Sequence, residues 1–397
     1  MNAKPPLHYV STRGQAEPLG FADVLLAGLA PDGGLFVPEV WPQFSNGDWR
    51  ALRGRPYVDA AFAILKPFAV AMGEAELKSD IAAAYATFGV SEVILYPHGR
   101  VSDVQRRQMT TVSDGNVHAL AVEGTFDDCQ AIVKALFADA PFRDAVGLAA
   151  VNSINWARIA AQIVYYATAA LALGAPEKRV SFAVPTGNFG DIYAGYAAKR
   201  MGLPVGRLII ATNVNDILAR TLETGRYEVR GVTATSSPSM DIQVSSNFER
   251  LLFELGGRDA ELIARLMRDL KEKGAFELPA SMLARLREDF TAFRADEGEV
   301  AATIAEVQKK EGILIDPHTA VGLVAARKAG DDGAPLVALA TAHAAKFPDA
   351  VAKAAGRAPE LPEALKPMMT APERFSVVEA RTESVKWFIQ DHLRMPR

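Results

Sequence analysis

Cysteine and long apolar runs are what this sequence most clearly lacks. Its 397 residues include a single cysteine, Cys129, so no internal disulfide can form and a reducing compartment is expected. No run of 18 apolar residues occurs, which argues against a membrane-spanning helix. The first residues also lack the apolar stretch of a secretory signal. We therefore expect a soluble, cytoplasmic protein with no membrane partner.

The sequence also has no excess of basic over acidic side chains. The 43 Lys and Arg residues are outnumbered by 47 Asp and Glu residues, which gives a net charge of -4. Because nucleic-acid binding depends on neutralising phosphates with Lys and Arg, we expect no nucleic-acid partner. The sequence also has no Gly-x-Ser-x-Gly turn, no Walker-type loop, no His-Glu-x-x-His and no paired cysteines. These absences argue against a serine hydrolase, a P-loop enzyme and a metal site.

Short apolar runs that alternate with helical patterns are present from residue 91 onward. Such runs predict buried strands at 93–96, 117–122, 180–184, 208–211 and 336–340. Between them, helical patterns occupy 125–136, 155–173 and 191–200. This alternation predicts an α/β fold with parallel sheets flanked by helices. The first 88 residues mix short strands and helices, and we expect them to form an N-terminal α+β domain, residues 1–88.

Local signals fix the start of several helices. Ser102 is followed three residues later by Gln105, which predicts a capping box. Thr125 is placed to cap the helix that follows it. Near the N-terminus, the pattern at 21–29 predicts an amphipathic helix before a Pro-Asp-Gly-Gly turn.

The segment Pro185–Asp191, with sequence PTGNFGD, is the sharpest local feature. It connects the strand predicted at 180–184 to the helix predicted at 191–200. Gly and Asn permit a tight turn with positive φ angles, and the free amides at a helix start attract anions. The loop therefore has the properties of a phosphate cup. Many such turns carry Gly and Asn with nothing bound, so from spacing alone both interpretations stay open.

A set of motifs spread along the chain resembles the threonine synthases. The set begins with Tyr9–Gly14 and Asp32–Pro38 and continues in the family's order to about residue 350. Its other members are Leu95–Ser102, Gly124–Gln130, Asn152–Arg158, Pro185–Asp191, Ala211–Asp216, Met240–Gln243 and Thr341–Phe347. As a set these motifs are highly specific to that family.

The resemblance implies a pyridoxal-phosphate enzyme of fold type II, similar to tryptophan synthase β. Such an enzyme converts O-phosphohomoserine and water to L-threonine and phosphate, in threonine biosynthesis. Two further domains are then expected, a small α/β domain at 89–145 and a large cofactor-binding domain at 146–397 with a helical C-terminal part. A monomer or homodimer is expected, with no metal.

Site residues follow from the resemblance by position. Gly187, Asn188, Phe189 and Gly190 would bind the cofactor phosphate, and the hydroxyl of Thr341 would face the pyridine nitrogen. Candidates for substrate binding are Asn152, Ser153, Asn155 and Arg158. Arg158 has the geometry to bind a phosphate bidentately, although an arginine on a long helix is more often an ordinary surface residue.

One expected segment is missing. In the family, the lysine that forms the Schiff base with the cofactor lies between a Tyr-Ala-Thr-Phe motif and the Leu-Tyr-Pro strand. Here Tyr85–Phe88 is followed almost at once by Val93, and no catalytic residue is assigned. The loss amounts to about two βα units, roughly 60 residues. It would leave neighbouring apolar strands without partners, so the small domain is expected to be truncated at 88–93.

Three hypotheses follow. The first, which we favour, is an active threonine synthase of which this chain is an incomplete version. The second is a catalytically inactive relative that binds pyridoxal phosphate, another phosphate ligand or a partner. The third is a phospho-lyase that acts on a related substrate. A wide Cα–Cα distance between Val90 and Ser91 would favour the first over the second.

Overall fold

The computed structural model describes residues 7–83, 92–149 and 153–392. Contacts divide the chain into two compact units. The larger comprises residues 1–82, 149–344 and 349–357, and the smaller comprises residues 83–148, 345–348 and 358–397. The N-terminal segment thus groups with residues 149–344, while the finer domain division given above stays a prediction. The expected junction around Val90–Ser91 lies outside the described residues, as does Asn152.

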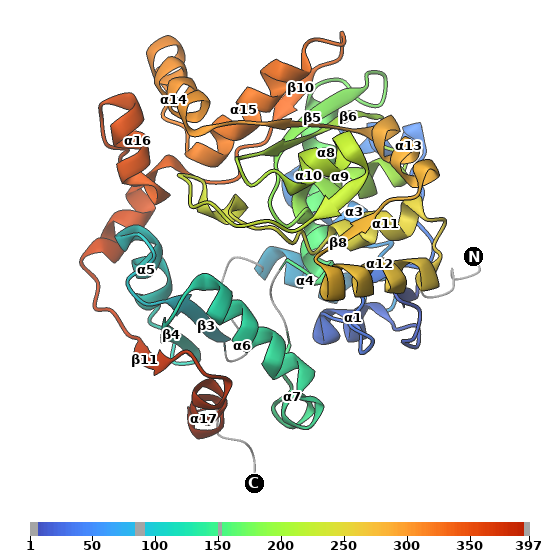
Figure 1. The fold of residues 1–397 in the computed structure, drawn as a ribbon. Coiled ribbons are helices and arrows are strands. Elements are labelled where there is room, and N and C mark those ends of the chain that lie inside the picture. Colours follow the sequence, from blue (N-terminus) through green and yellow to red (C-terminus); the bar gives the residue numbers. More distant parts are fainter. Residues whose placement is uncertain (1–6, 84–91, 150–152, 393–397) are drawn as a thin grey trace. The chain divides into compact units, whose positions relative to one another are not determined.

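Four parallel strands form the central sheet of the larger unit, in the order β10-β5-β6-β9 (Figure 1). Every residue of β5 is buried, as expected for a strand with neighbours on both sides. The predicted parallel sheet is therefore confirmed. The strands are β5 (Val180–Pro185), β6 (Val205–Thr212), β9 (Phe290–Arg294) and β10 (Leu336–Ala338).

One face of this sheet packs against α8 (Trp156–Ala172) and α9 (Gly190–Arg200). Phe182 and Val184 of β5 point to this side and are fully buried in its core. Because side chains alternate along a strand, the residues between them must face the other way. Burying each of these side chains contributes roughly 1.5–3 kcal/mol.

The opposite face packs against α14 (Glu297–Glu311) and α15 (Pro317–Ala329). Ala183 of β5 and Ile209 of β6 belong to this second core. Small side chains here let α15 approach the sheet closely, and a Cβ added at Gly322 would lie 3.3 Å from Pro185 Cγ. Helices therefore cover both faces, as the alternation predicts.

The remaining elements of the larger unit surround this sheet. Among its described residues are two antiparallel strand pairs, β1 with β2 and β7 with β8. The bounds are β1 (Tyr9–Ser11), β2 (Phe36–Pro38), β7 (Arg226–Glu228), β8 (Ala275–Glu277), α1 (Phe21–Ala27), α2 (Asn46–Leu52), α3 (Tyr57–Leu65), α4 (Glu74–Ala83), α10 (Ile217–Thr224), α11 (Phe248–Leu255), α12 (Ala260–Lys273), α13 (Ala280–Asp289) and α16 (Pro348–Ala355), with a 3₁₀ turn at Pro238–Met240.

The smaller unit contains a parallel sheet in the order β11-β4-β3. Its core lies between this sheet and helices α6 and α17, around Leu120, Ile132 and Phe388. The bounds are β3 (Glu92–Pro97), β4 (Val117–Glu123), β11 (Ser376–Glu379), α5 (Asp103–Thr110), α6 (Phe126–Ala138), α7 (Ala140–Val146) and α17 (Thr382–His392), with 3₁₀ turns at Ala344–Lys346 and Glu363–Met369.

Two strands with apolar sequences lie at sheet edges. In β3 the first four residues are only partly buried, although three of them are Val93, Ile94 and Leu95. In β10, Leu336 is exposed and Val337 only partly buried. A buried parallel strand usually has partners on both sides. Both strands therefore leave apolar side chains partly exposed at a sheet edge.

The helix starts agree with their sequence signals. Ser102 caps α5 in a capping box with Gln105, and Thr125 caps α6 in a capping box with Asp128. The helix predicted at 21–29 ends earlier, at Ala27, because Gly28 adopts a φ of 63° and its N–H returns to Val24 O. Glycine adopts this conformation without the steric cost of a Cβ.

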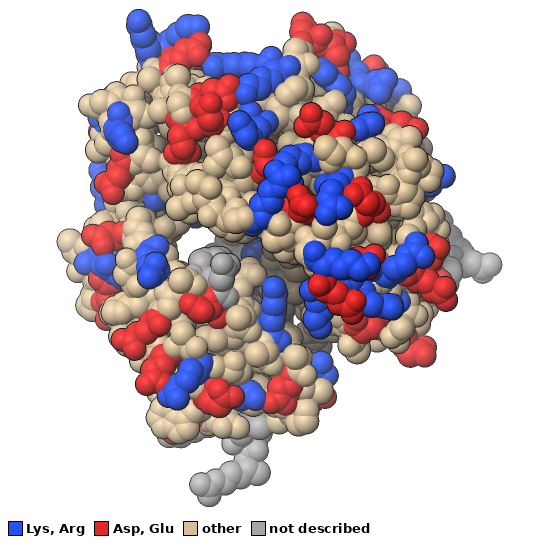
Figure 2. All heavy atoms as spheres, in the orientation of Figure 1, with Lys and Arg blue, Asp and Glu red and all other residues tan. Residues whose placement is uncertain are grey.

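Charge is mixed over the surface. Figure 2 shows basic and acidic side chains interspersed on the visible face, in keeping with the net charge of -4. Within the described ranges, no helix has both the length and the apolar character needed to cross a membrane.

Candidate cofactor-binding site

The carboxyl ends of two paired strands, β5 and β10, bring two predicted site segments to one edge of the larger unit's sheet. The loop that follows β5 contains Gly187, and Thr341 lies three residues beyond the end of β10. Because β5 and β10 are paired in parallel, both segments emerge at the same edge. In open α/β sheets, ligands bind outside the carboxyl ends of the strands. Thr341 is exposed there.

The loop turns sharply into α9 at Phe189. This residue has a φ of 67° and a ψ of 1°, in the left-handed region that side chains other than glycine rarely adopt. Its ring is buried, with centroids 5.1 Å from Phe248 and 5.8 Å from Phe290. Packing therefore offsets a backbone cost of about 1–2 kcal/mol. Left-handed strain of this kind is concentrated at functional sites.

The carbonyl groups of the loop are held by the segment that precedes α11. Ser245 Oγ donates to Gly187 O over 2.6 Å, and Asn247 N donates to Asn188 O over 3.0 Å. In a trans peptide, the N–H of the next residue points opposite to the C=O. The amides of Asn188 and Phe189 must therefore point away from Ser245 and Asn247.

No acceptor for the amides of Gly187, Asn188 and Phe189 is found within the described residues. The next amide, that of Gly190, donates to Asn188 Oδ1 over 2.9 Å. Behind them lies the positive end of the α9 dipole, which favours an anion. The residues present thus fit a phosphate group.

Close packing explains why Gly187 is a glycine. A Cβ added there would lie 2.7 Å from Ser239 O and 3.3 Å from Met240 Cα. Both contacts are with backbone, which cannot rotate out of the way as a side chain can. A side chain at this position would displace the loop.

Asp191 anchors the first turn of α9 to the neighbouring helix α8. Its Oδ1 accepts hydrogen bonds from the hydroxyls of Tyr165, at 2.6 Å, and Tyr166, at 2.9 Å. Burial raises the pKa of Asp191, and the two hydroxyls partly oppose that rise. Because its hydrogen bonds come from two tyrosines of the protein, this carboxyl group stabilises the start of the helix.

The predicted substrate residues fall into different environments. Asn155 is buried and caps α8, where its Oδ1 accepts from Ala157 N and its Nδ2 donates to Leu25 O. Ser153 is partly buried and its carbonyl accepts from Asn247 Nδ2 at 3.0 Å. Arg158 is exposed in the first turn of α8. The structure gives Asn155 a structural role, and the substrate roles of all four candidates stay predictions.

Sequence reasoning missed the residues that hold the loop. Arg250 is fully buried and donates to Phe36 O at 2.9 Å, to Ile154 O at 2.5 Å and to Asn247 Oδ1. Burial lowers the pKa of Arg250 to about 10, so the guanidinium stays charged at neutral pH. The only signal was a polar run, Ser245–Asn247, before an apolar helix, and that pattern does not reveal which atoms it contacts.

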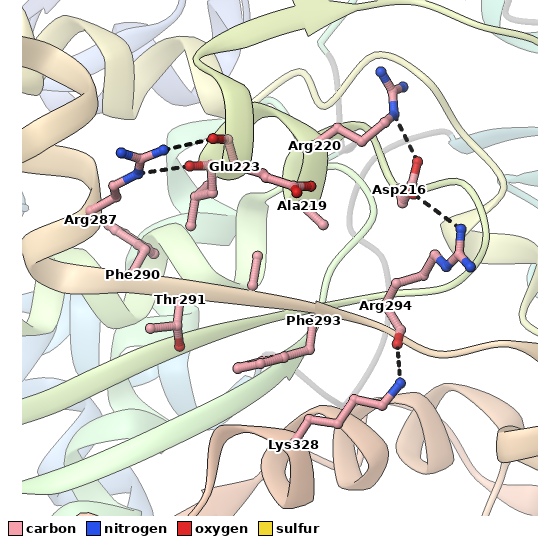
Figure 3. A pocket seen from close by; sticks show the side chains of 12 residues that line it. Asp216, Ala219, Arg220, Glu223, Arg287, Phe290, Thr291, Phe293, Arg294 and Lys328 are labelled. Carbon is pink, nitrogen blue, oxygen red and sulfur yellow. Dashed lines mark hydrogen bonds and ion pairs between the residues drawn. The ribbon is translucent and has the colours of Figure 1, made fainter. Parts of the chain in front are cut away.

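A surface pocket of about 700 Å³ lies elsewhere, along the outer edge of β9 (Figure 3). Its lining includes no residue of the loop after β5. Its cations are engaged: Arg287 donates to two backbone carbonyls of α10, Lys328 donates to Arg294 O, and Arg220 pairs with Asp216. We therefore place the candidate site at the loop. Among the described residues no cluster of side chains suited to a metal ion is found.

A phosphate cup at the carboxyl edge of a helix-flanked parallel sheet is common to several classes of phosphate-binding α/β enzyme, one of which uses pyridoxal phosphate. A family model described as "Pyridoxal-phosphate dependent enzyme" matches residues 80–341. Two further models, "Threonine synthase N terminus" and "Threonine synthase, C-terminal", match residues 8–85 and 319–389. The chain belongs to the threonine synthase family.

Individual relatives agree over almost the whole chain. The threonine synthase of Pseudomonas aeruginosa is 42% identical, with 97% of this chain and 98% of the relative covered. The crystal structure of pyridoxal-phosphate-bound threonine synthase from Brucella melitensis has a TM-score of 0.93 and 47% identity, covering 98% of this chain and 100% of that one. The yeast threonine synthase structure has a TM-score of 0.87 and 34% identity, covering 97% and 98%. The expected fold class is confirmed.

The alignments also bear on the missing segment. The match to the Pseudomonas aeruginosa relative extends over 462 positions, yet this chain has only 397 residues. The alignment must therefore contain gaps in this chain that account for the difference between these two lengths. The relative therefore contains residues that have no counterpart here, as expected from the absence of the lysine segment.

Proposed function

We propose that this protein has the site of a threonine synthase, which converts O-phosphohomoserine and water to L-threonine and phosphate with pyridoxal 5'-phosphate as cofactor. The observation that carries the proposal is the loop after β5, whose free amides form an anion site where this family's cofactor phosphate is expected. Family membership over nearly the full chain supports the choice of reaction.

Each proposed residue has a distinct task. Gly187, Asn188, Phe189 and Gly190 would bind the cofactor phosphate through the backbone. When bound, the cofactor supplies an electron sink for bond breaking at the substrate carbons. Thr341 would direct a neutral hydroxyl at the pyridine nitrogen, which keeps that nitrogen less protonated than a carboxylate would.

Substrate binding is assigned to residues near the start of α8. Arg158 would pair with an anionic group of O-phosphohomoserine, and Asn152 and Ser153 would line the same region. Asn155 would act indirectly, because its side chain caps α8.

The lysine that the family uses to hold the cofactor and move protons is not in this chain. We therefore propose that the chain binds the cofactor without a covalent bond and that turnover needs the absent segment. The alternative, a cofactor- or phosphate-binding relative without catalysis, is the less favoured candidate, because relatives that match almost the whole chain are threonine synthases. The two differ in whether the remaining site supports the reaction once the lysine is supplied.

The test compares two proteins, the present chain and a variant with the corresponding segment of the Pseudomonas aeruginosa relative inserted between Val90 and Ser91. We expect both to retain pyridoxal phosphate through gel filtration and only the second to form threonine from O-phosphohomoserine. An inserted variant that retains the cofactor but forms no threonine would support the non-catalytic candidate. Phosphate release from O-phosphoserine or O-phosphothreonine instead would support another phospho-lyase.

We also propose a cytoplasmic location and a monomeric or homodimeric state. The location is supported by the one cysteine, Cys129, which is a buried free thiol. Size-exclusion chromatography with light scattering measures the oligomeric state directly.

A further inference from the structure

Three residues behind the phosphate loop form a connected unit, here named the brace: Ser245, Asn247 and Arg250. Ser245 and Asn247 hold the carbonyls of Gly187 and Asn188. All three brace residues are buried in the larger unit. They lie on the opposite side of the loop from the amides that are free to bind an anion.

We propose that the brace sets the orientation of the loop's peptide planes, so that Ser245, Asn247 and Arg250 are positioning residues for the cofactor phosphate; the inference rests on the cofactor site proposed above. With the Gly187 carbonyl free, the 187–188 peptide has no bond to fix its plane. A rotation of that plane would replace an amide that faces the phosphate by a carbonyl oxygen, which repels it.

The backbone of Ser245 is itself held by Tyr227. Its backbone N–H donates to Tyr227 Oη at 2.9 Å. The Tyr227 ring is stacked between Phe248, with centroids 5.6 Å apart, and Phe276, with centroids 4.9 Å apart. The residue that holds Gly187 O is therefore anchored through its backbone to a buried aromatic stack.

Asn247 uses every polar atom it has. Its N and Nδ2 both donate to Asn188 O, at 3.0 and 3.3 Å, and Nδ2 also donates to Ser153 O. Its Oδ1 accepts from Arg250 Nη1. This last bond decides which way the amide group faces, because the guanidinium donates only and must meet the oxygen.

Arg250 ties the brace to two other parts of the larger unit. Its Nε donates to Phe36 O on β2, and its Nη2 donates to Ile154 O just before α8. No carboxylate is hydrogen-bonded to this guanidinium within the described part of the chain. Burying a charge that is hydrogen-bonded only to carbonyls and one amide oxygen costs free energy. This cost is understandable if the guanidinium serves to orient those oxygen atoms.

The brace acts on the phosphate and not on the ring, so its test is the preference for pyridoxal phosphate over pyridoxal. Dissociation constants for both compounds would be measured by equilibrium dialysis on wild type, Ser245→Ala and Asn247→Ala. We expect each variant to lower the preference about tenfold, the equivalent of about 1.4 kcal/mol. Affinity for pyridoxal itself should change less than twofold.

Ser181→Ala is the matched control. Ser181 is equally buried and accepts a hydrogen bond from Arg207 N at 2.9 Å, but it lies at the amino end of β5, away from the loop. It should reduce thermal stability without altering the preference. Arg250→Met would test the third residue, and Ser245→Ala keeps the inference testable if that variant does not fold.

The outcomes separate the two proposals. A wild type that binds pyridoxal and pyridoxal phosphate equally would refute the cofactor site and this inference with it. A wild-type preference that survives in folded Ser245→Ala and Asn247→Ala would refute the brace alone.

Discussion

A central strand of the larger unit and an edge strand of the smaller unit are buried to different degrees. All residues of β5 in the larger unit are buried, whereas four of the six residues of β3 in the smaller unit are partly exposed. Strand β5 has a neighbour on each side, and β3 has a neighbour on one side only. The fully buried β5 can therefore anchor the strained loop that follows it, whereas β3 leaves apolar side chains partly exposed at a sheet edge.

The largest loss of stability should come from truncating an apolar side chain in the core of each unit. Phe182→Ala should cost about 3–5 kcal/mol, because the ring is fully buried against Tyr166. Leu95→Ala on half-buried β3 should cost about 1–2 kcal/mol, since part of the side chain already contacts water. Urea unfolding followed by circular dichroism measures both. Equal losses would show that β3 is as well packed as β5.

A smaller but more local effect is expected at the loop. Gly187→Ala places a Cβ against Ser239 O, so we expect a loss of about 1–3 kcal/mol in stability and a large loss of pyridoxal phosphate binding. Gly115→Ala in the smaller unit is the matched control, because no atom lies within 4 Å of its added Cβ. Normal cofactor binding by Gly187→Ala would contradict the close packing described for the loop.

An acid-sensitive contribution to stability is expected in the smaller unit. Arg106 lowers the pKa of Glu373 to about 2, against an ordinary value of 4.5, and Thr110 adds a hydrogen bond. A carboxyl group with a depressed folded-state pKa stabilises the fold fully above the unfolded value. That contribution should be lost as pH falls from about 4.5 towards 2.

The variant Glu373→Gln measures this contribution. Because Arg106 is partly exposed, we expect a loss of only about 1 kcal/mol at pH 7. The difference from wild type in urea unfolding should shrink as the pH approaches 2. A difference that is constant between pH 7 and pH 2.5 would mean that the ion pair does not stabilise this unit.

The smallest effect is expected in the pocket beside β9. Arg294 is more than half exposed and lies 3.5 Å from Asp216. Arg294→Ala should change stability by less than about 0.5 kcal/mol and should leave pyridoxal phosphate binding as it is. A clear loss of binding would move the candidate site from the loop to this pocket.

Several elements were predictable because their signals are local. The capping box at Ser102 and the helix cap at Thr125 depend on residues close in sequence, and the structure shows both. The apolar run of β5 likewise predicts a buried strand. The early end of α1 was missed because Gly28 can either continue a helix or leave it, and the sequence pattern alone does not choose.

The candidate site was predictable only in part. The loop Gly187–Gly190 was identified from its composition and its place between a strand and a helix. Its three supports, Ser245, Asn247 and Arg250, were not, because they lie about 60 residues further along the chain. A hydrogen bond between residues so far apart produces no recognisable spacing pattern in the sequence.

The sequence by itself determined the alternation of strands and helices, the family and the absence of the expected lysine, because each depends on residue identity and order. Only the tertiary structure decided which groups face the phosphate. The amides of Asn188 and Phe189 are available because Ser245 and Asn247 hold the carbonyls on the other side. A peptide plane is free to rotate in an isolated loop, and contacts from a distant segment fix it.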